Sequence, residues 1–253
     1  RIEQFLGVAK ESEKNPKRRL DSFAYLAALW VVALSGALSY FVYQGVPHVP
    51  DEAQYLFQAR YMAAGQLTVD PPRVPEAFGM YMIPQDDERW FGIFAPGWPA
   101  VLALGVKAGA VWMVNPLLAG ICVLLAYLFF QDFYSRRFAR IAVLLLCASP
   151  WFVFTAMSFM CHIFTLVCAL SAAVLLRKAF KAKKARYAFA AGLAVGVVSL
   201  IRPFDALLLA GLLGIWTLVA LPKWREKFIA GAALAVDGFH RGFRGDQLVA
   251  VLR

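Results

Sequence analysis

Long apolar runs without a charged residue alternate with short basic clusters along this chain. The first run spans residues 22–44, and its 23 residues are enough for one helix to cross the ~30 Å hydrocarbon core of a bilayer. Similar runs span 111–130, 187–201 and 206–221. The run 141–176 has 36 residues and would extend about 54 Å as one helix, so we expect it to cross twice. The pattern predicts an all-α, polytopic membrane helix bundle with about six to seven transmembrane helices.

Two positions compete for the break inside this longest run. Ser158, Cys161 and His162 interrupt the apolar residues and favour a hairpin near residues 156–162. Pro150 is the alternative, because a proline removes a hydrogen bond from a helix interior and disrupts it. The sequence leaves both breaks open.

The Lys and Arg residues set the expected orientation of the bundle. If the spans alternate, 18 of the 26 basic residues lie on one side, in the clusters 1–19, 131–140, 177–186 and 222–227. Cytoplasmic loops are the ones enriched in Lys and Arg, so we expect the basic N-terminal segment 1–21 to be cytoplasmic. The loop 45–110 then faces outward, carries seven carboxylates against four basic residues, and is expected to contain juxtamembrane helices.

The composition agrees with membrane spans, since 61% of the residues are hydrophobic. A net charge of +10 would suggest a nucleic-acid partner only if the basic residues shared one folded face. Here they are spread between apolar runs, so we expect no nucleic acid. The four cysteines lie inside apolar runs and lack the spacing of metal ligands: Cys122, Cys147, Cys161 and Cys168.

An acidic pair follows the first apolar run and begins a predicted helix over residues 51–64. Pro50 suits the first turn of this helix, and Gly65 suits its C-terminal stop. Asp51 and Glu52 suit its positive N-terminal end, where each would contribute ~0.3 to 1 kcal/mol. The alternative is that one carboxylate is partly desolvated at the membrane surface and acts as a general base with a raised pKa. The residues alone leave both interpretations open.

The order of several short motifs resembles that of a known family. Five residues after the first apolar run resemble the first external loop of the C-type integral membrane glycosyltransferases: Asp51, Glu52, Tyr55, Ala59 and Gly65. This group includes protein O-mannosyltransferases and lipid A aminoarabinose transferases. Further segments resemble sequence landmarks of bacterial members and occur in the same order as in the family: 94–105 (FAPGWPAVLALG), 115–120 (NPLLAG), 149–153 (SPWFV), 157–162 (MSFMCH) and 201–203 (IRP). The resemblance covers residues 20–221.

The resemblance implies a hexosyl or pentosyl transferase that moves a sugar from a polyprenyl-phosphate donor to a hydroxyl of a lipid, glycan or protein acceptor. The transfer would take place at the external face of a bacterial plasma (inner) membrane, with inversion at the anomeric carbon. By the same resemblance Asp51 is the general base, and Tyr55 belongs to the substrate-binding residues. Glu52 would orient or tune Asp51, because two adjacent carboxylates near lipid resist joint ionisation.

Arg202 and His162 are candidate ligands of the donor phosphate. A cation at the end of a membrane helix is costly unless it is paired. Arg202 has a pairing partner in Asp205, and its planar guanidinium equally suits a phosphate. His162 could instead be a satisfied core or interfacial histidine. Relatives place a second acidic residue near this position, so no cofactor is assigned and a divalent metal is left open.

Weaker candidates lie in the predicted outer loop. Lys107 and Arg89 are alternative phosphate ligands, and His48 flanks the acidic pair, where it could contact sugar or acceptor or simply be solvated. Aromatic residues gather in the second half of the loop, and anchoring at the membrane interface explains them, with sugar stacking as the alternative: Trp90, Phe91, Phe94, Trp98 and Trp112.

The expected domain organisation is a transmembrane glycosyltransferase-like domain over residues 22–236 and an atypical tail over 237–253. Asp237 ends a short seventh apolar run, 228–236, so we expect an N-terminal portion of a longer enzyme with a truncated or frame-shifted tail. Two other classes remain as alternatives. A transporter favours ionisable residues near the membrane midplane, whereas here they crowd the outer ends of the spans. A non-catalytic scaffold subunit would use the acidic loop for docking.

Overall fold

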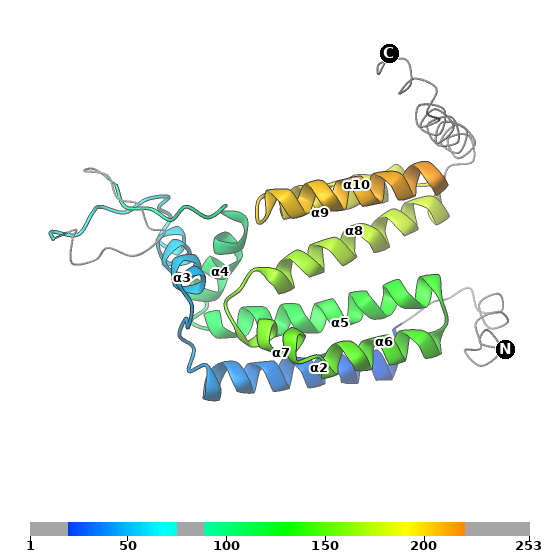
Figure 1. Cartoon of the computed structure of the whole chain (residues 1–253), viewed down its shortest axis with the longest axis horizontal. Helices are drawn as coiled ribbons and strands as arrows, with labels where there is room; N and C mark the ends of the chain where they lie inside the picture. Colours follow the sequence, from blue (N-terminus) through cyan, green and yellow to red (C-terminus); the bar gives the residue numbers. More distant parts are fainter. Residues whose placement is uncertain (1–19, 75–88, 221–253) are drawn as a thin grey trace, which may run out of the picture. The chain divides into compact units, whose positions relative to one another are not determined.

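The computed structural model describes residues 20–74 and 89–220, and the regular structure in this part is helical (Figure 1). The expected all-α class is confirmed, since the described residues contain a single isolated β-bridge, between Val69 and Trp90, and no strand. The helices are α2 (Ser22–Ala37), the π-helix η1 (Leu38–Val42), α3 (Pro50–Ala63), α4 (Gly97–Lys107), the 3-10 helix η3 (Val111–Met113), α5 (Val114–Phe133), α6 (Arg136–Ala148), α7 (Pro150–Met157), α8 (His162–Ala182), α9 (Ala185–Ser199) and α10 (Pro203–Ala220).

The chain divides into two units, residues 1–206 and 207–253. The first unit contains α2 to α9 and the first turn of α10, and all contacts described below lie within it. The described part of the second unit is the rest of α10, an apolar helix. Several sequence expectations lie outside the described residues, namely those for the segment 1–19, part of the outer loop, the run 228–236 and the tail 237–253.

The helices include enough apolar spans for a multi-pass membrane protein. Four stretches are long and apolar enough to cross a bilayer: Ser22–Val42, Val111–Phe133, His162–Ala182 and Pro203–Ala220. The bent pair of α6 and α7 either makes a fifth, broken span or enters and leaves the bilayer on one side. The remaining apolar helix, α9, has 15 residues and extends about 22 Å, less than the ~30 Å hydrocarbon core. Four to five of the expected six to seven spans are therefore found among the described residues.

The apolar run 141–176 contains both of the breaks that the sequence left open. Ser149 ends α6 and caps α7, its hydroxyl accepting a hydrogen bond from the Phe152 amide, and Pro150 occupies the first turn of α7. The chain bends by 61° there. A second break follows at residues 158–161, before α8. The run thus forms three helices where we expected two, because a proline and a polar segment each interrupt it.

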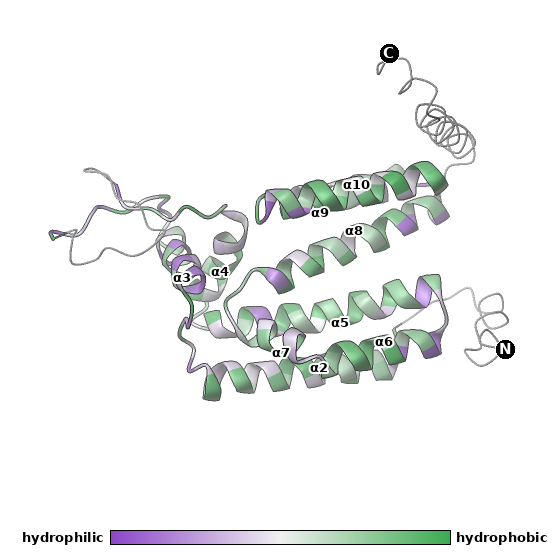
Figure 2. Cartoon of the chain, in the orientation of Figure 1, coloured by the Kyte–Doolittle hydropathy of each residue, from purple (hydrophilic) through white to green (hydrophobic). Residues whose placement is uncertain are grey.

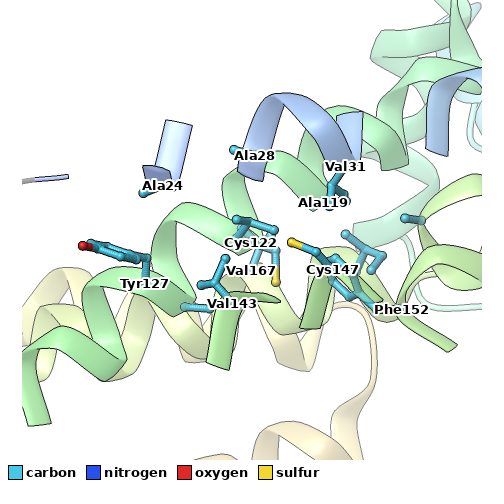
Figure 3. Close-up of a cluster of buried hydrophobic side chains, with 14 of the residues drawn as sticks. Ala24, Ala28, Val31, Ala119, Cys122, Tyr127, Val143, Cys147, Phe152 and Val167 are labelled. Atoms are coloured by element: carbon cyan, nitrogen blue, oxygen red, sulfur yellow. The ribbon is translucent and has the colours of Figure 1, made fainter. Parts of the chain in front are cut away.

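Small side chains allow α2, α5 and α6 to pack closely in the apolar part of the bundle. Ala24, Ala28 and Cys122 are buried in this cluster (Figure 3). A Cβ atom on Gly120 of α5 would lie 2.6 Å from Cγ2 of Val32 on α2, so only glycine permits this approach. In membranes, where lipid is as apolar as the helices, such close contact is what holds helices together.

Large apolar side chains cover the outside of the same helices, as expected for a surface that faces lipid. Figure 2 shows hydrophobic residues along the helix walls and hydrophilic residues concentrated on α3 and near helix ends. The exposed apolar side chains include Leu26, Leu29, Trp30, Leu145 and Trp151. Their exposure would be unfavourable in water but is favourable in a bilayer.

The two ends of the first unit differ in their polar contacts. The end opposite α3 and α4 holds an ion pair between Arg140 Nη2 and Asp21 Oδ2, 2.7 Å apart, and Asp21 also accepts a hydrogen bond from the Tyr127 hydroxyl. Burial raises the pKa of Asp21, but the hydrogen bonds from Arg140 and Tyr127 outweigh it, so the pKa is lowered overall. At the same end Asp132 pairs with Arg177 and Lys181.

Candidate functional site

The acidic pair lies in the first turn of α3, as the sequence predicted. The helix begins at Pro50 and ends at Ala63, and Gly65 follows with a φ of 81°, a conformation that favours glycine. The two carboxylates differ in exposure: Glu52 is 1% exposed, whereas Asp51 is only partly buried. Asp51 is therefore the one accessible to a substrate.

Glu52 accepts three hydrogen bonds and connects three parts of the chain. Its Oε1 accepts from the Tyr43 hydroxyl at 3.1 Å and from the Phe159 amide at 3.3 Å, and its Oε2 accepts from the His48 amide at 2.9 Å. Burial and the negative charge of Glu52 raise the pKa of Tyr43 to about 12. The buried carboxylate thus joins the end of the first span, α3 and the turn before α8.

The imidazole of His48 lies against Tyr43. The two ring centroids are 4.1 Å apart, and Nε2 of His48 is 3.1 Å from the Tyr43 carbonyl oxygen. The expected contact of His48 with sugar or acceptor therefore competes with an internal hydrogen bond.

The turn at residues 158–161 is held by side chains from α4 and α5 as well as by Glu52. The indole N–H of Trp98 donates to the Phe159 carbonyl at 2.7 Å. The amide nitrogen of Asn115 lies 2.6 Å from the Ser158 carbonyl oxygen and 2.8 Å from that of Met160. Sequence reasoning missed both roles. Trp98 had been grouped with interfacial aromatic residues, but it is 0% exposed.

Tyr55 connects the same turn to the charged residues. Its hydroxyl donates to Sγ of Cys161 at 3.5 Å, and its ring stacks on Phe94 with centroids 4.5 Å apart. Burial raises the pKa of Tyr55 above its ordinary value, the neighbouring Cys161 and Asp51 raise it further, and the charge of Arg202 lowers it. Through its hydroxyl, Tyr55 therefore links α3 to the turn before α8.

His162 is the first residue of α8 and directly follows Cys161, whose Sγ accepts from the Tyr55 hydroxyl. Its Nδ1 atom is buried and has no hydrogen-bond partner in the described part of the chain. A buried polar atom without a partner is uncommon and suggests a ligand or water. We give the name charged cluster to four residues on segments that hydrogen bonds bring to this end of the bundle: Asp51, Tyr55, His162 and Arg202.

Arg202 reaches the charged cluster because α4 and the end of α9 approach each other closely. The Gly97 amide donates to the Leu200 carbonyl at 2.8 Å, and a Cβ atom on Gly97 would lie 2.6 Å from that oxygen. Nε of Arg202 is 2.9 Å from Oδ2 of Asp205, and the Arg202 side chain remains 41% exposed. The ion pair anticipated from the sequence is present, and the guanidinium is still accessible.

A family model described as dolichyl-phosphate-mannose-protein mannosyltransferase matches residues 99–236, more than half of the chain. The chain belongs to this family. Comparisons with curated proteins and with solved structures found no match. Membership confirms the resemblance to C-type membrane glycosyltransferases, and it indicates a glycosyltransferase that uses a lipid-linked sugar donor and an acceptor.

The matched part of this mannosyltransferase-family chain covers only some of the candidate residues. His162, Arg202 and Lys107 lie within it, whereas Asp51, Glu52 and Tyr55 precede it. The roles of the acidic pair therefore rest on the geometry of α3 and on the motif resemblance, not on the family match.

Lys107 lies apart from the charged cluster. It is exposed in the last turn of α4, and the opposite end of that helix, Gly97, is the one that contacts Leu200. At 1.5 Å per residue, the 11-residue helix places Lys107 about 15 Å along its axis from Gly97. Its position therefore supports Lys107 less than Arg202 as a candidate phosphate ligand.

The described residues contain no group of three or more His, Cys, Asp or Glu side chains that could hold a metal ion. The carboxylate nearest in sequence to Arg202, Asp205, is engaged in the ion pair. The residues described here thus give no geometric argument for the divalent metal that the sequence left open.

Proposed function

We propose that this chain transfers a sugar from a polyprenyl-phosphate donor to an acceptor hydroxyl at the external face of the membrane, with inversion at the anomeric carbon. The observation that carries the proposal is that an accessible carboxylate, Asp51, and an accessible guanidinium, Arg202, lie on segments that meet at one end of the bundle. Glu52 and Tyr55 of α3 bind the turn before His162, and Gly97 of α4 binds Leu200 beside Arg202. A base and a phosphate ligand at one site are what this reaction requires.

In the proposed reaction Asp51 accepts the proton of the acceptor hydroxyl. The acceptor oxygen attacks the anomeric carbon from the face opposite the phosphate, the bond between that carbon and the phosphate oxygen breaks, and polyprenyl phosphate leaves with the electron pair. Attack from the opposite face inverts the configuration. The proton on Asp51 is later lost to water, to which its partial exposure gives access.

The departing phosphate is assigned to Arg202 and His162. Asp205 engages Nε of Arg202, so the terminal nitrogens are the ones proposed to bind phosphate oxygens, for which a planar guanidinium is well suited. The buried Nδ1 of His162 without a partner supports its assignment as a second polar contact. Tyr55, whose hydroxyl contacts Cys161 directly before His162, is assigned to substrate positioning, and Glu52 to support of the first turn of α3.

The proposed orientation places α3 and α4 outside and the N-terminus in the cytoplasm of a bacterium, with the protein in the inner membrane. Supporting this orientation, the end of the first unit opposite α3 carries the basic residues of α6 and the α8–α9 connection. The acceptor is assigned only by class, as a hydroxyl of a lipid, glycan or protein.

The test uses the full chain in lipid nanodiscs with a panel of polyprenyl-phosphate sugars, and it measures release of polyprenyl phosphate. We expect release with at least one donor and a loss of 100-fold or more in kcat for Asp51→Asn, since a general base typically contributes ~10²- to 10⁴-fold. Asp70→Asn, which removes an exposed carboxylate outside α3, is the matched control and should leave kcat unchanged. Equal activity of Asp51→Asn and wild type would exclude Asp51 as the base. Absence of release with every donor, in a folded protein, would favour a transporter or scaffold.

A further inference from the structure

The turn at residues 158–161 is shaped mainly by side chains from distant parts of the chain. Within the turn, the Ser158 hydroxyl donates to the Thr155 carbonyl and accepts from the Met160 amide at 3.4 Å. Side-chain hydrogen bonds from distant parts of the chain come from Glu52 and Tyr55 of α3, from Trp98 of α4 and from α5. A segment held in this way keeps its conformation only while those helices keep theirs.

Asn115 holds backbone carbonyls of the turn that follows α7. Buried backbone carbonyls outside a helix have no partner in a helical hydrogen-bond ladder and must be satisfied by other donors. The Asn115 amide nitrogen donates to the Ser158 and Met160 carbonyls, and the side chain is 2% exposed, so water is largely excluded from these bonds. A buried carbonyl without a donor costs ~1 to 3 kcal/mol, which makes this amide strongly preferred at its position.

Trp98 and Glu52 bind the two sides of one residue, Phe159. Its amide donates to Glu52 and its carbonyl accepts from Trp98. Because peptide groups are rigid planes, fixing the amide on one side and the carbonyl on the other leaves the backbone of Phe159 little freedom to rotate.

We propose that Trp98 and Asn115 are positioning residues that set the place of His162 relative to Asp51. His162 follows Phe159 by three residues and begins α8 directly after the turn, while Asp51 is the sequence neighbour of Glu52. The same contacts that hold the turn therefore fix the spacing between the two side chains. The importance of that spacing for catalysis rests on the proposed function, whereas the spacing itself does not.

This inference also assigns a role to motifs that the resemblance left without one. Trp98 lies in the segment 94–105 and Asn115 in 115–120, and both contact the segment 157–162. Gly97, in the first of these segments, brings Arg202 of the 201–203 motif to the same end of the bundle. The four motifs thus meet in space around the charged cluster.

The first test measures the position of His162 without any substrate. The full chain, which has three histidines, is labelled with ¹³C-histidine in nanodiscs, and the His162 signal is assigned by its loss in His162→Gln. Trp98→Phe removes the indole donor and keeps an aromatic ring, and we expect it to shift the His162 signal. Trp112→Phe, whose ring packs on Tyr40 instead, should leave that signal in place. An unchanged His162 signal in Trp98→Phe would overturn the proposal.

The second test separates positioning from stability by kinetics. If Trp98 acts through His162, Trp98→Phe should lower kcat/KM for the polyprenyl-phosphate sugar on the order of 10- to 100-fold in the wild type and have no further effect in His162→Ala. Multiplicative losses in the double variant would show independent, merely structural effects and contradict the proposal. Asn115→Ala serves as a second variant in both tests. If Asn115→Ala does not fold because the Ser158 and Met160 carbonyls lose their donor, Trp98→Phe alone decides the outcome. If the wild type turns over no donor, the proposed function fails and the histidine signal alone decides this inference.

Discussion

The Glu52 carboxylate and the Phe159 amide, 107 residues apart in sequence, lie 3.3 Å from each other. This hydrogen bond connects the first turn of α3 to the turn before α8. It is made by the buried member of the acidic pair, and the partly exposed member, Asp51, belongs to the charged cluster. The two neighbouring carboxylates therefore have separate tasks, one structural and one proposed to be catalytic.

Replacing Glu52 with alanine should strongly destabilise the protein. Three donors would lose their acceptor, among them the buried Tyr43 hydroxyl, and each unsatisfied buried group costs ~1 to 3 kcal/mol. We expect a loss of about 3 kcal/mol or more, measured as a lower unfolding temperature by circular dichroism in detergent. Asp51→Ala is the control and should cost ~1 kcal/mol or less. Equal unfolding temperatures for the two variants would refute a structural role for Glu52.

Arg202→Lys should lower kcat/KM for the lipid-linked donor by about 10-fold or more, because an ammonium group cannot bind two phosphate oxygens in the planar manner of a guanidinium. Steady-state kinetics of polyprenyl phosphate release measures the effect. Arg60→Lys makes the same charge-conserving substitution at the exposed C-terminal turn of α3 and should have no effect. If both variants behave like the wild type, another residue binds the phosphate.

Gly97→Ala should disrupt the approach of α4 to the end of α9. The added methyl carbon would lie 2.6 Å from the Leu200 carbonyl oxygen, so the backbone must shift and Arg202 with it. We expect reduced thermal stability and reduced kcat/KM. Gly192→Ala is the matched control, since no atom lies within 4 Å of the new Cβ and alanine favours a helix by ~1 kcal/mol over glycine. A Gly97→Ala protein as stable and active as Gly192→Ala would contradict the close approach.

The ion pair of Asp21 should make the stability of the fold decrease as the pH falls into the acid range. The folded-state pKa of Asp21 is lowered from its ordinary value of 3.8, so its contribution is present above pH 3.8 and is lost as the pH falls through the folded pKa. Unfolding temperatures of wild type and Asp21→Asn, measured between pH 7 and pH 2.5, should differ at neutral pH and converge at the acid end. A constant difference across this range would mean that the carboxylate charge does not stabilise the fold.

The features predicted correctly from the sequence are those with local causes. Pro50 and Gly65 mark the ends of α3, and the predicted helix agrees with the observed one to within one residue at each end. The apolar runs likewise predict the long helices, because crossing a bilayer imposes a minimum length. The family resemblance followed from motif order and is confirmed.

Features that depend on tertiary contacts could not be predicted in this way. Pro150 and residues 158–161 were treated as alternatives, yet both interrupt the run, because neither signal says whether a neighbouring helix will satisfy the broken backbone. Trp98 looked like an interfacial aromatic residue because hydropathy does not reveal what its N–H contacts. The assignment of the candidate site residues remains a prediction, and the variants above test it.

The direction of protein synthesis gives the turn before α8 a further property. Glu52, Trp98 and Asn115 precede Phe159 by 107, 61 and about 44 residues, so these three side chains have left the ribosome before the turn itself does. Their contacts with the turn can therefore form without waiting for α9 or any later segment. Assembly of the charged cluster is then completed in chain order, with Arg202 arriving last.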